Sequence, residues 1–590
     1  MRLLVGKIKK ALHFFSQHNQ SGLFEEMLEP LLTFMRGIRI FSLSGILLFS
    51  FLLDFSVWFP IPCKITAILM QGGVVIKLIF EERYLFLRFR RLSWQKRLIP
   101  IALFGIGLLF YIEKALVFLE MFRQPEGLLN HTYRLYSIIF LCCAFAIYAL
   151  RLNIIARFLS HLNLRPAQTL ALGFILLIFV GTLLLSLPQM VADPSKISFI
   201  DAIFTSTSAS TVTGLVLFPI SEYYRPTGLW IILLLIQLGG LGIMTFGVLF
   251  SLMSHQRMGL KAEVTLQGVL ATESVGTVRR EIQQIFLITF TIETLGALLL
   301  WLFLPKDGTH SFFTAFFHAI SAFCNAGFSL FPANLEGHTT HLLVNLIIAI
   351  LIILGGIGFP VINNLGSYPL FGPRRTAWRL SFHSKMVLSI SVCLLFVGTV
   401  GIYILEYSST LSSLSWYEKW VAAAFHSVTA RTAGFNTLNP AHFRDATLLL
   451  LIVLMMIGGS PASTAGGIKT TTFGVMLATI RAMLQRREEV SIFKRSLSPS
   501  AVRKSLSIGF VSSALVALFL LLLLSTEQES FKSLMFETAS AFNTVGLSTG
   551  TTSRLSPIGK LIITLTMFVG RIGPMTLAFS LAERVSKGKY

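Results

Sequence analysis

The sequence predicts an all-α polytopic membrane protein, with four helix–pore-loop–helix repeats around a central pore and about four additional N-terminal transmembrane helices. Three observations support this fold class. Of the 590 residues, 54% are apolar and only 13% are charged, and the mean hydropathy is +0.74, far above that of a soluble domain. About twelve apolar runs approach the 20 residues or so that a spanning helix needs. Four short glycine-containing segments recur between the later runs.

The first part of the chain holds four predicted spans, at 37–57, 61–80, 98–119 and 134–152. None of them carries the repeated glycine segment. We therefore interpret residues 1–160 as an accessory N-terminal transmembrane bundle, with a regulatory or partner-docking module as the alternative. We predict no removable signal peptide, because the basic N-terminus is not followed by an apolar run with a small-residue cleavage site.

Positive charges predict how the spans are oriented. Lys and Arg number 21 in five segments that we place in the cytoplasm and 8 in the loops of the opposite side, a bias typical of cytoplasmic loops. The five segments are 151–165, 251–284, 363–385, 481–504 and 584–590. With the Arg-rich stretch 83–97 also inside, the spans alternate and both termini lie in the cytoplasm. This bias accounts for the net charge of +22 without nucleic-acid binding, which we do not expect.

An internal repeat organises the chain from residue 166 onward. The repeated segments are SerThrValThrGlyLeu at 210–215, PheCysAsnAlaGlyPhe at 323–328, ArgThrAlaGlyPhe at 431–435 and PheAsnThrValGlyLeu at 542–547. Their glycines are separated by 113, 107 and 112 residues. Four copies of one supersecondary unit are the simplest account of this spacing. We assign the four repeats to 166–250, 285–362, 385–480 and 505–583.

A short semi-polar stretch precedes each repeated glycine. The stretches begin near Phe199, Phe312, Trp416 and Phe531. At about 12 residues they are too short to cross a bilayer. Irregular backbone at membrane depth is tolerated only where it is buried or lines a water-filled cavity. We therefore expect a half-helix that enters from outside, turns at the glycine and returns.

Four such turns around one axis suit the binding of a dehydrated potassium ion, because backbone carbonyls can replace its hydration shell. Glycine permits backbone angles that a residue with a Cβ adopts poorly. The C-terminal ends of the half-helices add partial negative charge. The candidate filter residues are Thr211, Val212, Thr213, Gly214, Cys324, Asn325, Ala326, Gly327, Arg431, Thr432, Ala433, Gly434, Asn543, Thr544, Val545 and Gly546.

The chain from about residue 166 to its end resembles the Trk/Ktr/HKT superfamily of cation transporters, and most of all their KtrB and TrkH type membrane subunits. Beside the filter segments, the motifs that carry the resemblance are GlyGlySerProAlaSerThrAlaGlyGlyIleLysThr at 458–470 and GlyArgIleGlyPro at 570–574. The resemblance implies potassium uptake across the cytoplasmic membrane. In that family a glycine at all four filter positions goes with potassium selectivity, whereas some plant relatives carry serine in the first repeat and favour sodium; Gly214 therefore implies potassium.

The resemblance also implies a gate and a pore arginine. Glycine pairs and Pro461 interrupt the second span of the third repeat, where the family has a flexible loop below the filter. The candidate gate residues are Gly458, Gly459, Ser460, Pro461, Ala462, Ser463, Thr464, Ala465, Gly466 and Gly467. Arg571 lies inside the last span, where an uncompensated cation is costly, and the resemblance gives it a pore role. For the gate segment the alternative is a packing kink between helices. For Arg571 it is a snorkelling or carboxylate-paired structural arginine.

Other polar residues of the spans are given structural roles. We expect Arg431 to brace its pore loop, since a bare positive charge in the ion path would repel cations. We expect His318 and His426 to be hydrogen-bonded packing residues rather than pH sensors. For Glu293 and Glu537 structural pairing is favoured and the role is left open. The five cysteines (Cys63, Cys142, Cys143, Cys324, Cys393) show neither disulfide nor metal spacing.

The resemblance implies that the subunit works as a homodimer under the control of a soluble nucleotide-binding subunit of the KtrA or TrkA type. No GxGxxG fingerprint occurs in the chain, so that domain is expected on another chain, docked at 251–284, 363–385 and 481–504. No cofactor is expected, since potassium is the substrate. An enzyme would need catalytic groups converging at membrane depth, and none is arranged so. An ion-coupled symporter using sodium or protons, or a sodium-conducting variant, remains the alternative.

Overall fold

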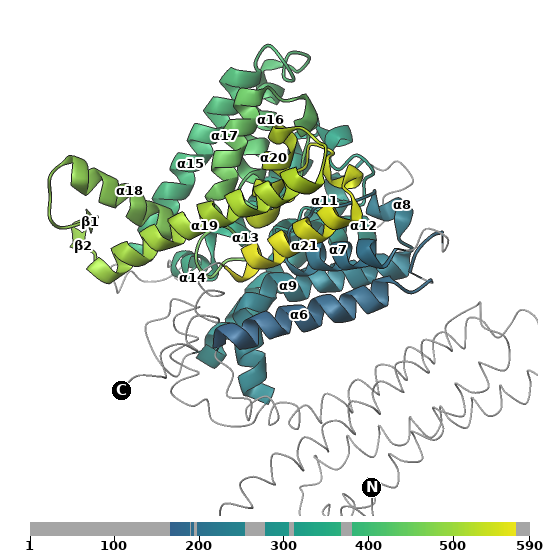
Figure 1. The fold of residues 1–590 in the computed structure, drawn as a ribbon, viewed down its shortest axis with the longest axis horizontal. Helices are drawn as coiled ribbons and strands as arrows, with labels where there is room; N and C mark the ends of the chain where they lie inside the picture. The colour runs from purple at the N-terminus through teal and green to yellow at the C-terminus, as the bar shows by residue number, and fades with distance from the viewer. Residues whose placement is uncertain are drawn as a thin grey trace, which may run out of the picture. The chain divides into compact units, whose positions relative to one another are not determined.

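The computed structural model describes residues 166–188, 190–193, 198–253, 278–305, 312–366 and 380–573. Contacts divide the chain into two units. One of them, residues 1–164 with 250–257, lies almost wholly outside the described residues, and so do the four predicted N-terminal spans and both termini. The other unit holds the repeats, and it is built almost entirely from helices (Figure 1).

The same three-helix succession occurs four times in the described part of the chain. A first helix is followed by a half-helix and then by a second helix. The first helices are α6 (Pro166–Leu185), α11 (Val278–Phe303), α15 (Phe382–Glu406) and α19 (Pro499–Thr526). The half-helices are α7 (Phe199–Ser210), α12 (Phe312–Phe323), α16 (Trp416–Thr429) and α20 (Phe531–Phe542). The second helices begin with α9 (Pro226–Met253), α13 (Leu342–Ile357), α17 (Asp445–Met456) and α21 (Pro557–Ile572).

The half-helices begin at the residues predicted from the sequence, and local chemistry explains two of the starts. Before α16, Ser415 and Glu418 form a capping box. Before α20, the hydroxyl of Ser530 accepts from the N–H of Ser533. Such caps satisfy donors that the first turn of a helix leaves unpaired.

The second helices of repeats two and three are broken. The chain bends by 103° between α13 and α14 (Phe359–Gly366), at Gly358, whose φ is 95°. The third repeat leaves helical geometry at Ile457 and resumes with α18 (Thr470–Leu484). Within the described residues, three helices are long and apolar enough to cross a membrane, and the bent pair would make a fourth. The sequence predicts eight spans from residue 166 onward, and the breaks at Gly358 and Ile457 interrupt two of these apolar runs.

Each half-helix packs beside the second helix of another repeat. Helix α16 contacts α13, α20 contacts α17, and α7 contacts α21. The rings of Trp230 on α9 and Phe313 on α12 lie 4.7 Å apart. The order of contacts is therefore cyclic. Repeats one and four are the furthest apart in the sequence, yet their helices α7 and α21 lie side by side (Figure 1).

Short elements fill the connections. They are α8 (Ile220–Tyr223) and the 3-10 turns η3 (Glu336–His338), η4 (Pro440–His442) and η5 (Thr552–Arg554). An antiparallel pair, β1 (Ser491–Ile492) and β2 (Arg495–Ser496), departs from the all-helical prediction. Its turn residues Phe493 and Lys494 both have positive φ, which a two-residue hairpin turn of this kind requires.

Candidate functional site

The four repeated glycines lie next to one another in a ring. A Cβ built on Gly327 would stand 2.5 Å from the carbonyl oxygen of Ala433, and one built on Gly434 would stand 2.5 Å from that of Val545. Gly546 meets the carbonyl of Thr213 and Gly214 that of Ala326 even more closely. The order 214, 327, 434, 546 and back to 214 closes the ring. Each glycine is thus required by contact with the backbone of the next repeat.

Backbone conformation repeats with the sequence. All four glycines have positive φ, from 69° to 92°. The residue two places earlier also has positive φ, although it carries a Cβ: Val212, Asn325, Thr432 and Thr544, with values from 51° to 70°. Each such residue costs about 1–3 kcal/mol. Alternating left- and right-handed residues bring peptide N–H groups to one side and their carbonyls to the other.

A buried serine holds the N–H side of this segment in the first repeat. The N–H of Gly214 donates to Ser208 Oγ at 3.1 Å, and that hydroxyl donates to the carbonyl of Leu215 at 2.8 Å. Ser540 accepts the N–H of Gly546 in the same way, and Ser321 donates to Phe328. The third repeat has Val428 at this register, so its turn is held by other contacts.

The predicted gate residues lie in the non-helical segment 457–469, directly beside the ring. Thr464 Oγ1 lies 3.2 Å from the carbonyl oxygen of Phe323, the last residue of half-helix α12, and 3.1 Å from that of Gly355. A Cβ on Gly466 would meet the hydroxyl of Thr544 in the fourth filter segment. The N–H of Ser460 donates to the carbonyl of Gly356 at 3.0 Å. This segment therefore touches repeats two and four at once.

Arg571 is buried and joins the segment 457–469 to the first repeat. Its two terminal nitrogens donate to the carbonyls of Thr464, at 2.6 Å, and Gly239, at 2.8 Å. No ion pair to Arg571 is present in the described residues, which counts against the carboxylate-paired alternative. Lys469, which is half-buried, donates to the carbonyl of Ala465 at 2.7 Å, so a second cation stabilises the same segment.

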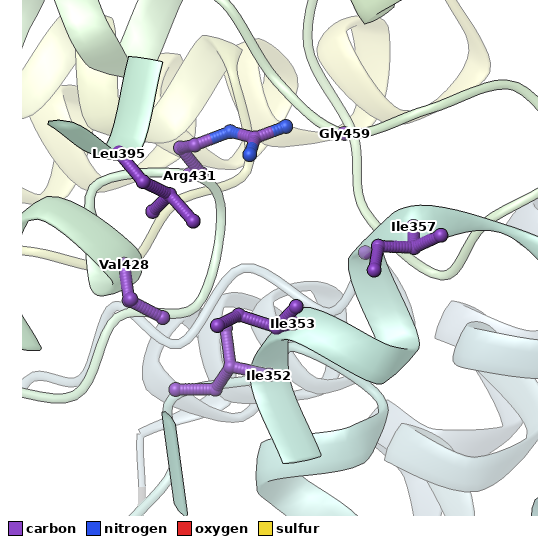
Figure 2. A pocket seen from close by; sticks show the side chains of 8 residues that line it. Ile352, Ile353, Ile357, Leu395, Val428, Arg431 and Gly459 are labelled. Carbon is purple, nitrogen blue, oxygen red and sulfur yellow. The ribbon is translucent and has the colours of Figure 1, made fainter. Parts of the chain in front are cut away.

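Arg431 lines a small pocket. Its Nη2 donates to Ser391 Oγ on α15 at 3.2 Å. Figure 2 shows its guanidinium extending toward Gly459, above Val428 and the isoleucines of α13. The pocket encloses about 290 Å³, including its open side. Arg431 thus contacts the first helix of its own repeat, as a bracing residue would.

The two histidines of the half-helices are hydrogen-bonded packing residues, as predicted. His318 lies 2.7 Å from the carbonyl of Thr314 and 3.0 Å from Ser329 Oγ. His426 accepts the N–H of Leu438 at 3.1 Å. Each ring thereby connects its half-helix to the chain that follows the filter glycine.

Glu293 and Cys324 lie together behind the second filter segment. Glu293 on α11 accepts from Gln237 Nε2 at 3.1 Å, and the buried thiol of Cys324 lies 3.8 Å from the carboxylate. Cys324 and Cys393 are free thiols. The remaining cysteines lie outside the described residues.

Sequence reasoning missed a second repeated feature. A glycine in the second helix lets it cross the end of the half-helix: Gly239 meets the carbonyl of Ser210, Gly355 that of Phe323, and Gly570 that of Phe542. The signal was available, since GlyGlyLeuGly at 239–242, GlyGlyIleGly at 355–358 and GlyArgIleGly at 570–573 share one pattern. In this pattern Arg571 stands where two other repeats have a second glycine.

Comparison with known proteins decides the family. The family model of the TrkH cation transport proteins matches residues 128–589. The chain belongs to the TrkH family of cation transport proteins. It is 41% identical over 422 residues to Ktr system potassium uptake protein B of Bacillus subtilis, covering 71% of this chain and 93% of the relative. It is 35% identical over 434 residues to the potassium/sodium uptake protein NtpJ of Enterococcus hirae, covering 72% and 95%.

The TrkH fold is also found among solved structures. The crystal structure of the potassium transporter TrkH from Vibrio parahaemolyticus matches with a TM-score of 0.59 and 20% identity, over 83% of this chain and 99% of the other. As a member of the TrkH family the chain is a transport protein and not an enzyme.

Proposed function

We propose that this TrkH-family chain takes up potassium ions across the cell membrane through the ring formed by Gly214, Gly327, Gly434 and Gly546. The observation that carries the proposal is the ring itself, in which four carbonyl-bearing turns with alternating positive φ meet around one axis. Buried oxygens of Thr432, Thr544 and Asn543 have no partner in the described residues, so this region offers ligands to a cation or its water. The names of the Bacillus subtilis and Vibrio alginolyticus relatives support potassium as the ion.

The segment 457–469 is the proposed gate. It lies against Phe323, at the end of half-helix α12, and against Thr544 in the fourth filter segment, and Arg571 links it to α9. Displacing it requires breaking the bonds of Arg571 to Thr464 and Gly239. A regulatory partner that moves α18 would pull directly on this segment, because α18 begins where it ends. A homodimer and a soluble regulatory subunit complete the proposal.

Rubidium or potassium uptake, measured in cells that lack their own potassium uptake, tests this function. Wild type is expected to restore uptake, and Gly214→Ser to lose discrimination of potassium over sodium. Gly337→Ser is the matched control, since a Cβ on Gly337 meets nothing within 4 Å. No uptake by correctly inserted wild type, supplied with a matching soluble subunit, would overturn the proposal. Intact discrimination in Gly214→Ser would overturn the filter assignment alone. A truncation starting near Arg157 asks whether the N-terminal bundle is needed.

A sodium-conducting or ion-coupled mechanism is the second candidate. The Enterococcus hirae relative, at 35% identity, is named a potassium/sodium uptake protein. Four filter glycines argue against sodium as the preferred ion but not against coupling. Measuring potassium uptake with sodium or the proton gradient removed separates the two candidates, since uptake by a simple pore follows the membrane potential alone.

A further inference from the structure

A fully buried carboxylate holds the fourth filter segment from behind. Glu537, on half-helix α20, is 0% exposed. It accepts from Ser548 Oγ at 2.7 Å, from the N–H of Thr549 at 2.8 Å and its hydroxyl at 3.2 Å, and from Thr552 Oγ1 at 2.5 Å. All three partners follow Gly546 in the chain. The carboxylate therefore holds the segment that follows Gly546 against the half-helix α20 that precedes it.

The donor set fits an ionised carboxylate. The N–H of Thr549 can only donate, and three hydroxyls, each able to donate or accept, complete four hydrogen bonds on the two oxygens, so these partners can satisfy the ionised form. Several donors around one carboxylate stabilise its charged form. No Lys, Arg or His forms an ion pair with Glu537 in the described part of the chain. In its ionised form the carboxylate therefore has no cationic partner among these side chains, and it lies beside a path proposed for cations.

The other repeats place different chemistry at this register. In the second repeat His318 bonds the chain that follows the filter glycine, through Ser329 Oγ and the N–H of Leu330. Thr205 in the first repeat bonds Tyr224. The third repeat has Phe425, and the neighbouring His426 reaches Leu438 instead. Only the fourth repeat has a carboxylate nine residues before its filter glycine, so the four repeats surround the ring with different side chains.

We propose that Glu537 is a specificity-determining positioning residue of the cation path. This inference rests on the proposed function and deepens it. The carboxylate fixes the chain that follows Gly546, and this keeps the carbonyls of the fourth filter segment in place. Its charge also attracts a dehydrated cation, since a charge at low dielectric acts over several ångströms with little screening. Glutamine at this position keeps the size and the acceptor oxygen but removes the charge.

Glu537→Gln is expected to keep saturable rubidium uptake. The concentration for half-maximal uptake should rise by roughly three- to tenfold, as expected for the loss of one nearby charge, and the preference for potassium over sodium should fall. The maximal rate should change less. A purely structural role would instead lower the amount of protein in the membrane and the maximal rate, with half-saturation unchanged.

Glu406→Gln is the matched control. Glu406 is also 0% exposed and sits in a similar cradle, accepting from the N–H of Arg444 at 2.8 Å, Thr447 Oγ1 at 2.5 Å and Thr410 Oγ1 at 2.9 Å. It holds the start of α17 and touches no filter residue in these bonds. We expect Glu406→Gln to leave half-saturation and ion preference unchanged, even where it lowers thermal stability.

The outcomes separate this inference from the proposed function. A wild type without uptake overturns both. A transporting wild type whose Glu537→Gln variant has the same half-saturation and preference overturns the inference alone, and so does an equal shift in Glu406→Gln. If Glu537→Gln fails to accumulate, Ser548→Ala decides, because it removes one clamping bond and keeps the charge. A smaller shift in ion preference in the same direction supports the inference, and an unchanged preference overturns it.

Discussion

Lys560 Nζ lies 2.7 Å from a carboxylate oxygen of Asp201, and this ion pair joins the second helix of the fourth repeat to the half-helix of the first. The side chains are 19% and 15% exposed. Because no direct loop connects these two repeats, the pair and the packing of α7 on α21 close the ring. The contacts among the four glycines depend on this closure of the ring.

Breaking the pair is expected to destabilise the ring. Asp201→Asn or Lys560→Met leaves one partly buried charge alone, which costs roughly 1–3 kcal/mol once solvent screening is allowed for, and the double variant should recover part of the loss. The melting temperature of the purified protein in detergent measures this coupling. The exposed pair Lys532 and Asp445, at 60% and 75% exposure, is the control and should contribute at most about 1 kcal/mol. Equal losses of melting temperature for both pairs would show that the Asp201–Lys560 pair contributes no more to stability than an exposed ion pair.

Arg571→Gln is expected to speed cation uptake. It removes the guanidinium that donates to the carbonyls of Thr464 and Gly239. Losing even one of these two charged hydrogen bonds, worth about 1.5 kcal/mol, would favour the displaced state of the segment 457–469 by roughly tenfold. Initial rates of rubidium uptake measure the effect. Arg571→Lys, which keeps the charge but not the fork, should lie between. A loss of ion preference without a faster rate would place Arg571 in selectivity instead of gating.

Gly355→Ala is expected to prevent stable folding. Its Cβ would enter the carbonyl of Phe323, and neither backbone can move without disturbing the filter segment, so we expect a loss of at least about 3 kcal/mol. Gly366→Ala is the matched control, because a Cβ there meets nothing within 4 Å. Protein yield and thermal stability are the readouts. A stable Gly355→Ala protein would show that the helix crossing can loosen.

Glu336 and Glu418 are expected to give opposite pH dependences of stability. Burial raises the pKa of Glu336, against hydrogen bonding by Asn436, so its contribution weakens as the pH rises through the titration of the folded carboxyl. Hydrogen bonds from Ser415 lower the pKa of Glu418, so its contribution is lost as the pH falls through the folded pKa. Both effects should be small, because solvent screens these outer residues.

Melting temperatures of the two glutamine variants, measured from pH 3 to 8, check the signs. Relative to wild type, Glu336→Gln should gain stability toward high pH. Glu418→Gln should lose the stability that wild type gains above the acidic range. The same sign in both variants would contradict the assignment of causes.

Local sequence features predicted where the four short helices begin. The starts of the half-helices at Phe199, Phe312, Trp416 and Phe531 could be identified because each follows an apolar run and precedes a glycine segment at a regular interval. The interruption after Met456 was equally legible, since Pro461 and paired glycines do not continue a helix. Family membership followed from the same motifs.

Long-range contacts could not be predicted in this way. The strained residues Val212, Asn325, Thr432 and Thr544 have positive φ that their identities alone do not predict, and they lie in segments that contact the next repeat. The partners of Arg571 and Glu537 were left open because hydropathy records the cost of burying a charge but not the carbonyls or hydroxyls that offset it.

The sequence by itself determined the membrane class, the fourfold repeat and the positions of the turns, because these depend on composition and on spacing along the chain. Only the tertiary structure decided that the four glycines form one ring, that Asp201 and Lys560 close it, and that the segment 457–469 lies against it. These relationships join residues roughly a hundred or more positions apart. The periodic glycines mark where close contacts occur, but spacing along the chain does not specify which backbones or side chains meet across the fold.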